Sequence, residues 1–425
     1  TNTKNIPKKK KNNLRGVRGN EKVLFPTLIT KPCQGKKTIE LIHQTAKFNN
    51  TNTLFINICQ NFKSQADQLS NRLDNWKKGL DKATIEDLEK QIIVLHGGAD
   101  KSKDWRSYIY SAKHEDKRLI VTLPNKTRLK VVSDIIQHWL KDNSINKVFT
   151  FLDEADKTWK QYDKHVLKNQ DEEDIHNGRI LNTLVTASVE PLKTYFGKHF
   201  KGLQLSERSE NLDKYIHLNS IPWIYKKWET YEDIIQDIKD KNIEISHNDY
   251  IFCPSYWLND SQHESCCDFV NEIRSIVVLL INGKGLHIYK KNTSENVEKP
   301  IITFKKKDCS KGDCNGLYCN KCHPDIGGDM IKIIKKIKED FANDCAMIIS
   351  GNLCVGRAMT FHVPEMSFTK AFYSKEIEVG VGFKDKSTDD LYQLIARVCG
   401  SFKDKVKKLP TIYGSKNLQD IVLHL

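Results

Sequence analysis

The sequence contains no apolar run of about 18 residues, the length that a membrane-spanning helix requires, so no transmembrane segment is expected. It also lacks a signal-like start, because its first residues are threonine, asparagine and lysine. The first residue is not methionine, which suggests a processed form or a fragment. Hydrophobic residues make up 39% of the 425 residues, enough for sizeable cores, and the mean hydropathy of −0.55 predicts a soluble protein. At roughly 100–200 residues per domain, this length predicts two or three domains.

Acidic residues are fewer than basic ones: the sequence has 54 Asp and Glu residues and 68 Lys and Arg residues, which gives a net charge of +14. Such a surplus is typical of proteins that bind a polyanion, and the alternative is a Lys-, Asn- and Ile-rich composition inherited from an AT-rich genome. Residues 1–20 have no apolar period and include Lys8 to Lys11, Arg15 and Arg18, which predicts a disordered basic arm. The arm would contact phosphates, act as a nuclear localisation signal or only aid solubility.

Twelve cysteines without a secretory signal predict a reducing compartment, in which thiols are free or bind metal. Four soft ligands crowd into one short stretch, namely Cys309, Cys314, Cys319 and Cys322. This pattern predicts a tetrahedral structural Zn²⁺, with His323 as a substitute ligand, and the alternative is unligated or redox-active thiols. A catalytic zinc is not expected, because no glutamate base accompanies the cluster.

Apolar strands alternate with helix-prone stretches along the whole chain, which predicts α/β domains with parallel sheets and helices on both faces. Strands are expected at 23–30, 54–59, 92–96, 119–123, 148–152, 180–186, 249–254, 275–281, 346–350 and 368–373. Helices include 129–140, 231–243, 330–341 and 389–398. His263, near another helix start, is either a nucleic-acid contact or a satisfied surface group.

Two acidic residues, Asp153 and Glu154, directly follow the apolar strand at 148–152, and we call them the acidic step. Because parallel strands deliver their carboxyl ends to the edge where α/β sheets bind ligands, Asp153 and Glu154 are expected there. Asp153 is suited to hold Mg²⁺ and Glu154 to polarise an attacking water, which are two tasks of nucleotide hydrolysis. The alternative is a solvated acidic turn.

A second feature is the strand at 23–30, which leads through residues 31–38 into a predicted helix. This layout favours a phosphate-binding loop, in which Lys37 bridges β- and γ-phosphates and Thr38 binds Mg²⁺. The expected nucleotide-contacting residues of the loop are Gln34, Gly35, Lys36, Lys37 and Thr38. The pattern departs from the usual one because Lys36 stands where a glycine is common.

The segments Pro32–Thr38, Asp153–Asp156 and Thr186–Ser188 together resemble motifs I, II and III of superfamily 2 helicases. The form Pro-Cys-Gln-Gly-Lys-Lys-Thr is closest to a Pro-Thr-Gln-Ser-Gly-Lys-Thr variant of some viral and phage-type members. Residues 61–72 would then belong to motif Ia and Lys126–Arg128 to motif Ib, both of which line the nucleic-acid track in the family. The hydroxyl-rich turn at Thr186–Ser188 is expected to contact the acidic residues and relay nucleotide state, unless it is a simple strand-end turn.

The second half continues the resemblance. Gly356 and Arg357 match the Gly-Arg turn of motif V, and Gln393 and Arg397 match motif VI. The resemblance implies that Arg397 reaches the γ-phosphate as an arginine finger, with Arg357 as the alternative. Gly400 replaces the second arginine of motif VI, and a lone arginine could also be a surface ion pair.

The resemblance implies two tandem RecA-like domains that use ATP and Mg²⁺, with nucleic acid as partner, DNA favoured over RNA, and no membrane. The expected division is a basic arm at 1–20, a first domain at 21–215 and a second at 216–425, which carries a Cys-rich insertion at 300–328. The implied function is an ATP-dependent helicase in viral or mobile-element replication or transcription, inside the cell, alongside further domains or subunits. The alternatives are a duplex translocase without strand separation and a degenerate module that binds nucleic acid without hydrolysis.

Overall fold

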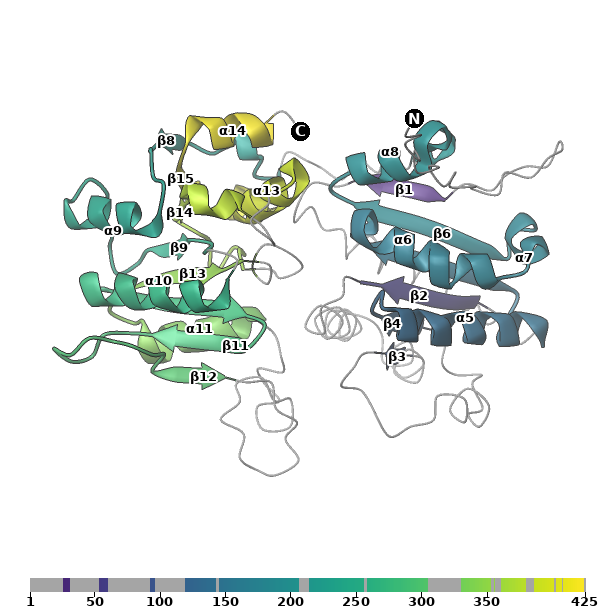
Figure 1. The fold of residues 1–425 in the computed structure, drawn as a ribbon, viewed down its shortest axis with the longest axis horizontal. Coiled ribbons are helices and arrows are strands. Elements are labelled where there is room, and N and C mark those ends of the chain that lie inside the picture. The colour runs from purple at the N-terminus through teal and green to yellow at the C-terminus, as the bar shows by residue number, and fades with distance from the viewer. Residues whose placement is uncertain are drawn as a thin grey trace, which may run out of the picture. The chain divides into compact units, whose positions relative to one another are not determined.

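The structure is a computed structural model that describes most of the chain in ranges separated by gaps. The ranges are 26–30, 53–59, 92–95, 119–142, 145–205, 214–255, 258–304, 330–352, 355, 361–379, 386–400, 403–406 and 408–423. By their contacts, the described residues up to Leu205 form one compact unit and those from Lys214 onward form a second (Figure 1). No helix within the described ranges is long and apolar enough to cross a membrane.

The first unit contains a seven-stranded sheet whose strands all run parallel. Its spatial order is β3-β4-β2-β5-β6-β1-β7. The strands are β1 (Thr27–Thr30), β2 (Thr53–Ile58), β3 (Ile92–Leu95), β4 (Leu119–Thr122), β5 (Lys147–Asp153), β6 (Ile180–Thr186) and β7 (Gln204–Leu205). The predicted parallel sheet is thus confirmed for this unit. All six residues of β2 are buried, as expected for a central strand of a parallel sheet.

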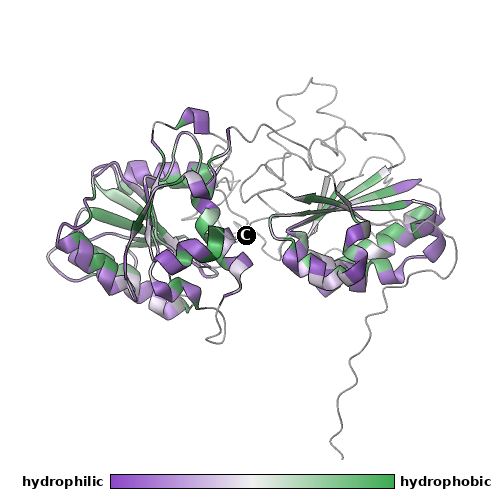
Figure 2. Ribbon diagram, turned by 90° about the horizontal axis from the view of Figure 1, so that it is seen from above, coloured by the Kyte–Doolittle hydropathy of each residue, from purple (hydrophilic) through white to green (hydrophobic). Residues whose placement is uncertain are grey.

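The described helices of the first unit pack on one face of this sheet (Figure 2). They are α5 (Lys126–Lys141), α6 (Ala155–His165), α7 (Glu172–His176) and α8 (Glu190–Phe196), with 3₁₀ turns η2 (Leu167–Asn169) and η3 (Gly197–Gly202). Helix α5 buries one apolar stripe that includes Leu129, Val132 and Ile136, because these residues recur at helical spacing. The Asn125 side chain caps the helix by accepting a hydrogen bond from the backbone N–H of Arg128.

The register of the parallel strands brings their carboxyl ends into one row. Thr30 of β1 pairs with Thr186 of β6, and Asp153 of β5 pairs with Val185 of β6. Strand β6 therefore lies between the strand that precedes the expected phosphate loop and the strand that carries the acidic step. Thr30, the last residue of β1, lies directly beside Thr186.

The second unit has an eight-stranded mixed sheet in the order β12-β11-β10-β13-β9-β14-β15-β8. The strands are β8 (Trp223–Tyr225), β9 (Tyr250–Phe252), β10 (Ile276–Asn282), β11 (Gly285–Tyr289), β12 (Ile302–Phe304), β13 (Ala346–Gly351), β14 (Lys370–Phe372) and β15 (Thr411–Gly414). Six of them are parallel, whereas β11 and β12 are antiparallel to their neighbours. The expectation of a purely parallel second sheet is therefore wrong, because a tight turn after β10 folds the chain back as a hairpin.

Helices cover both faces of this second sheet, as the two separate apolar clusters on either side of it show. They are α9 (Tyr231–Lys239), α10 (Asn259–Glu272), α11 (Met330–Phe341), α13 (Thr388–Ile395) and α14 (Lys416–Leu423), with 3₁₀ turns η5 (Leu218–Ser220), η6 (Lys375–Glu378), η8 (Ala396–Val398) and η9 (Lys403–Lys405). Two predicted helices end early. Helix α9 stops at Lys239 because Lys241 takes a left-handed conformation with φ of 58°, and α13 gives way to the 3₁₀ turn η8 after Ile395.

Candidate nucleotide site

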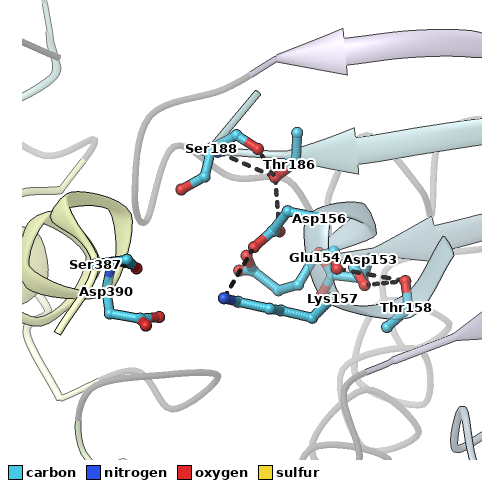
Figure 3. A network of polar contacts seen from close by, with 9 residues as sticks. All are labelled: Asp153, Glu154, Asp156, Lys157, Thr158, Thr186, Ser188, Ser387 and Asp390. Atoms are coloured by element: carbon cyan, nitrogen blue, oxygen red, sulfur yellow. Dashed lines mark hydrogen bonds and ion pairs between the residues drawn. The ribbon is translucent and has the colours of Figure 1, made fainter. Parts of the chain in front are cut away.

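The acidic step lies at the carboxyl end of β5, where the strand turns into α6 (Figure 3). Asp153 is the last residue of the strand, and Glu154 is the single residue that joins it to the helix. Glu154 has φ of 49° and ψ of 55°, a left-handed conformation that few residues other than glycine adopt. Its side chain is only 5% exposed. Backbone strain of this kind persists where the surroundings enforce it and is concentrated at functional sites.

Two local interactions hold the turn in place. The Oδ1 atom of Asp153 accepts a hydrogen bond from the backbone N–H of Glu154 at 3.0 Å. The hydroxyl of Thr158, in the first turn of α6, lies 3.2 Å from the carbonyl oxygen of Asp153 and 3.3 Å from that of Glu154. Thr158 was not identified from the sequence, although a hydroxyl five residues after the strand-end acid Asp153 is the available signal. These contacts hold the Asp153 carboxylate and the backbone of the turn in place.

A third contact ties the next strand to the acidic segment. The hydroxyl of Thr186, the last residue of β6, donates to Oδ1 of Asp156 at 2.9 Å (Figure 3). The same hydroxyl oxygen accepts the backbone N–H of Ser188 at 3.0 Å. Lys157 Nζ lies 4.0 Å from Oδ2 of Asp156. The hydroxyl-rich turn therefore does contact the acidic segment, as its sequence predicts.

Gln393 and Arg397 lie in the second unit. Gln393 is in α13 and is 1% exposed, whereas Arg397 is in the 3₁₀ turn η8 and is 4% exposed. The interpretation of Arg397 as a surface ion pair is wrong, because the side chain is buried. The Ser387 hydroxyl caps α13 by accepting the backbone N–H of Asp390 at 3.2 Å, which sets where this helix begins (Figure 3).

Most of the remaining predicted site residues lie outside the described residues. These are Gln34, Gly35, Lys36, Lys37, Thr38, Gly356, Arg357, Cys309, Cys314, Cys319 and Cys322. The basic arm at 1–20 and residues 61–72 also lie outside them. Their roles remain predictions.

Within the described ranges, no three His, Cys, Asp or Glu side chains converge as a metal cage.

No family model matches the chain, and no curated protein matches it in sequence. Solved structures match it in fold. One is Dbp5 of S. cerevisiae bound to RNA and ADP BeF3, with a TM-score of 0.51, 11% identity, and coverage of 94% of this chain and 82% of that one. A second is Mss116p bound to ssRNA and AMP-PNP, with a TM-score of 0.51, 14% identity, and coverage of 94% and 68%.

A third structure is the Escherichia coli DEAH/RHA helicase HrpB, with a TM-score of 0.50, 10% identity, and coverage of 93% of this chain and 41% of that one. At these identities the likeness concerns the fold. The chain therefore shares the fold of these structures, with two tandem RecA-like α/β units.

Proposed function

We propose that this protein is a nucleic-acid-dependent ATPase that acts as a helicase. The observation that carries the proposal is the Asp153–Glu154 step at the carboxyl edge of a parallel sheet, linked by Asp156 to Thr186 at the end of the adjacent strand. That edge is where α/β sheets bind ligands. The fold neighbours Dbp5 and Mss116p, which were solved with RNA and nucleotide analogues, support a nucleotide and a nucleic acid as the two ligands.

In this proposal the first unit holds Mg²⁺–ATP. Asp153 and Thr38 would hold the ion, and Lys37 would contact the β- and γ-phosphates. The backbone of Gln34, Gly35 and Lys36 would cradle the phosphates. Glu154, which the backbone holds in a left-handed turn at the end of β5, would orient the attacking water.

The second unit would complete the site. Arg397 would stabilise the charge that develops on the γ-phosphate, and Gln393 would act beside it. Gly356 and Arg357 would contact the nucleotide and the nucleic-acid backbone. A triphosphate shared by ligands from both units would draw them together, and hydrolysis would release them and step the bound strand.

The nucleic-acid partner follows from charge. A net charge of +14 favours a polyanion, and contacts to backbone phosphates would make the affinity fall with salt while giving little sequence preference. We propose DNA rather than RNA, in viral or mobile-element replication or transcription, with further domains or subunits attached.

The test is steady-state ATPase of wild type, Lys37→Ala and Glu154→Gln, each with single-stranded DNA, duplex DNA, RNA or no nucleic acid. The proposal expects stimulation in wild type and loss of turnover in both variants, with unchanged circular dichroism. A parallel strand-displacement assay separates a helicase from a duplex translocase, because only the helicase releases the labelled strand.

A non-hydrolysing binding module is the second candidate, and Lys36 and Gly400 favour it because each replaces a residue of the usual motifs. Nucleotide binding without turnover in wild type would establish it. The predicted structural zinc at Cys309, Cys314, Cys319 and Cys322 is tested separately by metal analysis after mild chelation.

A further inference from the structure

A continuous chain of polar contacts links α10 to strands β10, β11 and β12 in the second unit. We call it the imidazole–amide relay, and its members are Thr303, His287, Asn282, His263 and Tyr289. Asn282 is the last residue of β10, at the turn into β11. His287 is 4% exposed and Asn282 is 9% exposed, and buried polar atoms of this kind are normally hydrogen-bonded.

One backbone group fixes the direction of the relay. The N–H of Lys284 lies 2.9 Å from Oδ1 of Asn282, and a backbone N–H can only donate, so this amide atom is the oxygen. His287 Nε2 lies 3.1 Å from the same oxygen and must therefore carry a proton. In a neutral imidazole the other nitrogen is then an acceptor, and His287 Nδ1 accepts from the Thr303 hydroxyl at 3.1 Å.

The imidazole of His263 takes the other tautomer, with its proton on Nδ1. Asn282 Nδ2 has only protons to offer, and it lies 3.4 Å from His263 Nε2. His263 Nε2 is therefore unprotonated, and its proton sits on Nδ1, which donates to the Tyr289 hydroxyl. In this arrangement His263 is neutral with its proton on Nδ1, whereas His287 carries a proton on Nε2, and both assignments follow from the orientation of the Asn282 amide.

Protonation of His263 is incompatible with this arrangement. A proton on His263 Nε2 would point at the N–H protons of Asn282 Nδ2, so two donors would meet with no acceptor between them. Rotating the amide would restore that contact, but it would remove Oδ1 from both the Lys284 N–H and His287 Nε2. The charged form of His263 therefore breaks the bonds that hold the β10–β11 turn.

The surroundings of His263 oppose its charged form. Burial, followed by the Lys284 ammonium, lowers the pKa of His263, and Asp260 raises it by a smaller amount. Lys284 Nζ lies 3.8 Å from Oδ1 of Asp260. Burial also raises the pKa of Tyr289, so the phenol remains protonated. The titratable or charged groups around the relay are Asp260, Glu264, Cys266 and Cys267 of α10, Lys284 of the turn, and His287 and Tyr289 of β11.

We propose that the relay is a pH-sensitive lock that holds the β10–β11 turn against α10 only while His263 is neutral. Because the folded protein disfavours the proton, the lock is closed above about pH 6.5, the ordinary pKa of histidine, and opens as pH falls below it. This inference does not depend on ATP hydrolysis.

The lock acts at the carboxyl edge of the second sheet. Ile281, which precedes the relay amide, pairs with Gly351 of β13, and the adjacent Asn352 side chain donates to the Ser255 carbonyl after β9 at 2.7 Å. Ligands of α/β sheets bind at this edge, so opening of the turn would change the surface offered there.

The first test is imidazole ¹⁵N NMR on the full chain with labelled histidine. At pH 7.5 we expect His263 to be the Nδ1–H tautomer and His287 the Nε2–H tautomer. On acidification, protonation of His263 below pH 6.5 should coincide with loss of exchange protection at the Lys284 amide, after correction for intrinsic exchange. Identical tautomers, or Lys284 protection that does not follow His263, would overturn the lock.

The second test replaces the amide with a carboxylate. An aspartate at 282 can only accept, so Asn282→Asp should recruit a proton onto His263 Nε2 and raise the pKa of His263 above 6.5. The matched control is Asn292→Asp, which adds the same charge at an exposed position outside the relay and should leave His263 unchanged. A His263 pKa that Asn282→Asp does not raise, or that both variants raise equally, contradicts the relay.

Discussion

The hydroxyl of Thr186 donates a hydrogen bond to the Asp156 carboxylate across 2.9 Å, which joins the end of β6 to the first turn of α6. Thr186 also pairs with Thr30, the last residue of β1. Thr186 thus connects the acidic segment, through its side chain, with the strand that leads into residues 31–38, through its backbone pairing. In the proposed function this is the route by which a change at the phosphates would reach the rest of the first unit.

The first prediction concerns this hydroxyl. Thr186→Ala removes the hydroxyl that donates to Oδ1 of Asp156, and a buried polar atom that loses a hydrogen bond costs about 1–3 kcal/mol. We expect a lower denaturation midpoint for Thr186→Ala in urea unfolding. The control is Thr186→Ser, which keeps the hydroxyl and should stay close to wild type. Equal midpoints for the two variants would show that the hydrogen bond contributes nothing.

The second prediction isolates the strain at Glu154. Glu154→Ala and Glu154→Gly both remove the carboxylate, but only glycine adopts φ of 49° without a steric penalty. We expect the glycine variant to be more stable than the alanine variant by about 1 kcal/mol. Chemical denaturation of the pair measures the difference. Both variants should lack ATPase activity, and an alanine variant as stable as the glycine one would mean that the turn is unstrained.

Much of the first unit could be predicted from its sequence, because the signals are local. An apolar run before Asp153 identifies a buried strand and its polar end, and the alternation with helical periods identifies a parallel sheet. The contact between Thr186 and Asp156 spans 30 residues, so the hydroxyl-rich strand end indicated a contact with the acidic residues but not which two side chains would meet. The left-handed conformation of Glu154 had no signal either, since neither glycine nor asparagine marks it.

The second unit was harder to predict for physical reasons. The turn at Gly283-Lys284 was recognisable, but β11 (Gly285–Tyr289) is too short to show a distinctive period. The antiparallel return of the chain is therefore decided by tertiary pairing with β10. Arg397 was placed on a regular helix, whereas the structure shows a 3₁₀ turn, because helix ends vary by one or two residues.

The third prediction concerns Asp249, which is 5% exposed and accepts hydrogen bonds from Lys370, Thr369 and the backbone of Ser246. Burial raises the pKa of Asp249, but these donors outweigh burial and hold it below its usual range. Asn replacement removes the charge, so Asp249→Asn should destabilise the second unit by about 2–3 kcal/mol at pH 7.

The sign of its pH dependence follows from the lowered pKa. The stabilising contribution of Asp249 is complete above the unfolded pKa of about 3.9 and is lost as pH falls through the lower folded value. Urea unfolding at pH 7 and at pH 3 should therefore show a smaller gap between wild type and Asp249→Asn at the lower pH. A gap that stays constant would mean that the carboxylate charge does not contribute.

The fourth prediction tests whether Arg397 acts through the geometry of its guanidinium group and not through its positive charge alone. Lysine keeps the positive charge but lacks the planar fork that contacts two phosphate oxygens. In the proposed function, Arg397→Lys should lower kcat by about 10³-fold, as expected for loss of an arginine finger. The control is Arg274→Lys at an exposed position of the same unit. Thermal melts of both variants check that the buried site still folds, and wild-type turnover in a folded Arg397→Lys would remove Arg397 from the mechanism.

The central claim is that a nucleotide is hydrolysed at the Asp153–Glu154 step under the control of nucleic acid. The most direct measurement is the rate of phosphate release from ATP at saturating single-stranded nucleic acid, in wild type and in Glu154→Gln. The account predicts stimulated turnover in wild type and a loss of at least about 100-fold in the variant, whose nucleotide affinity persists. Equal turnover in the two proteins would contradict it.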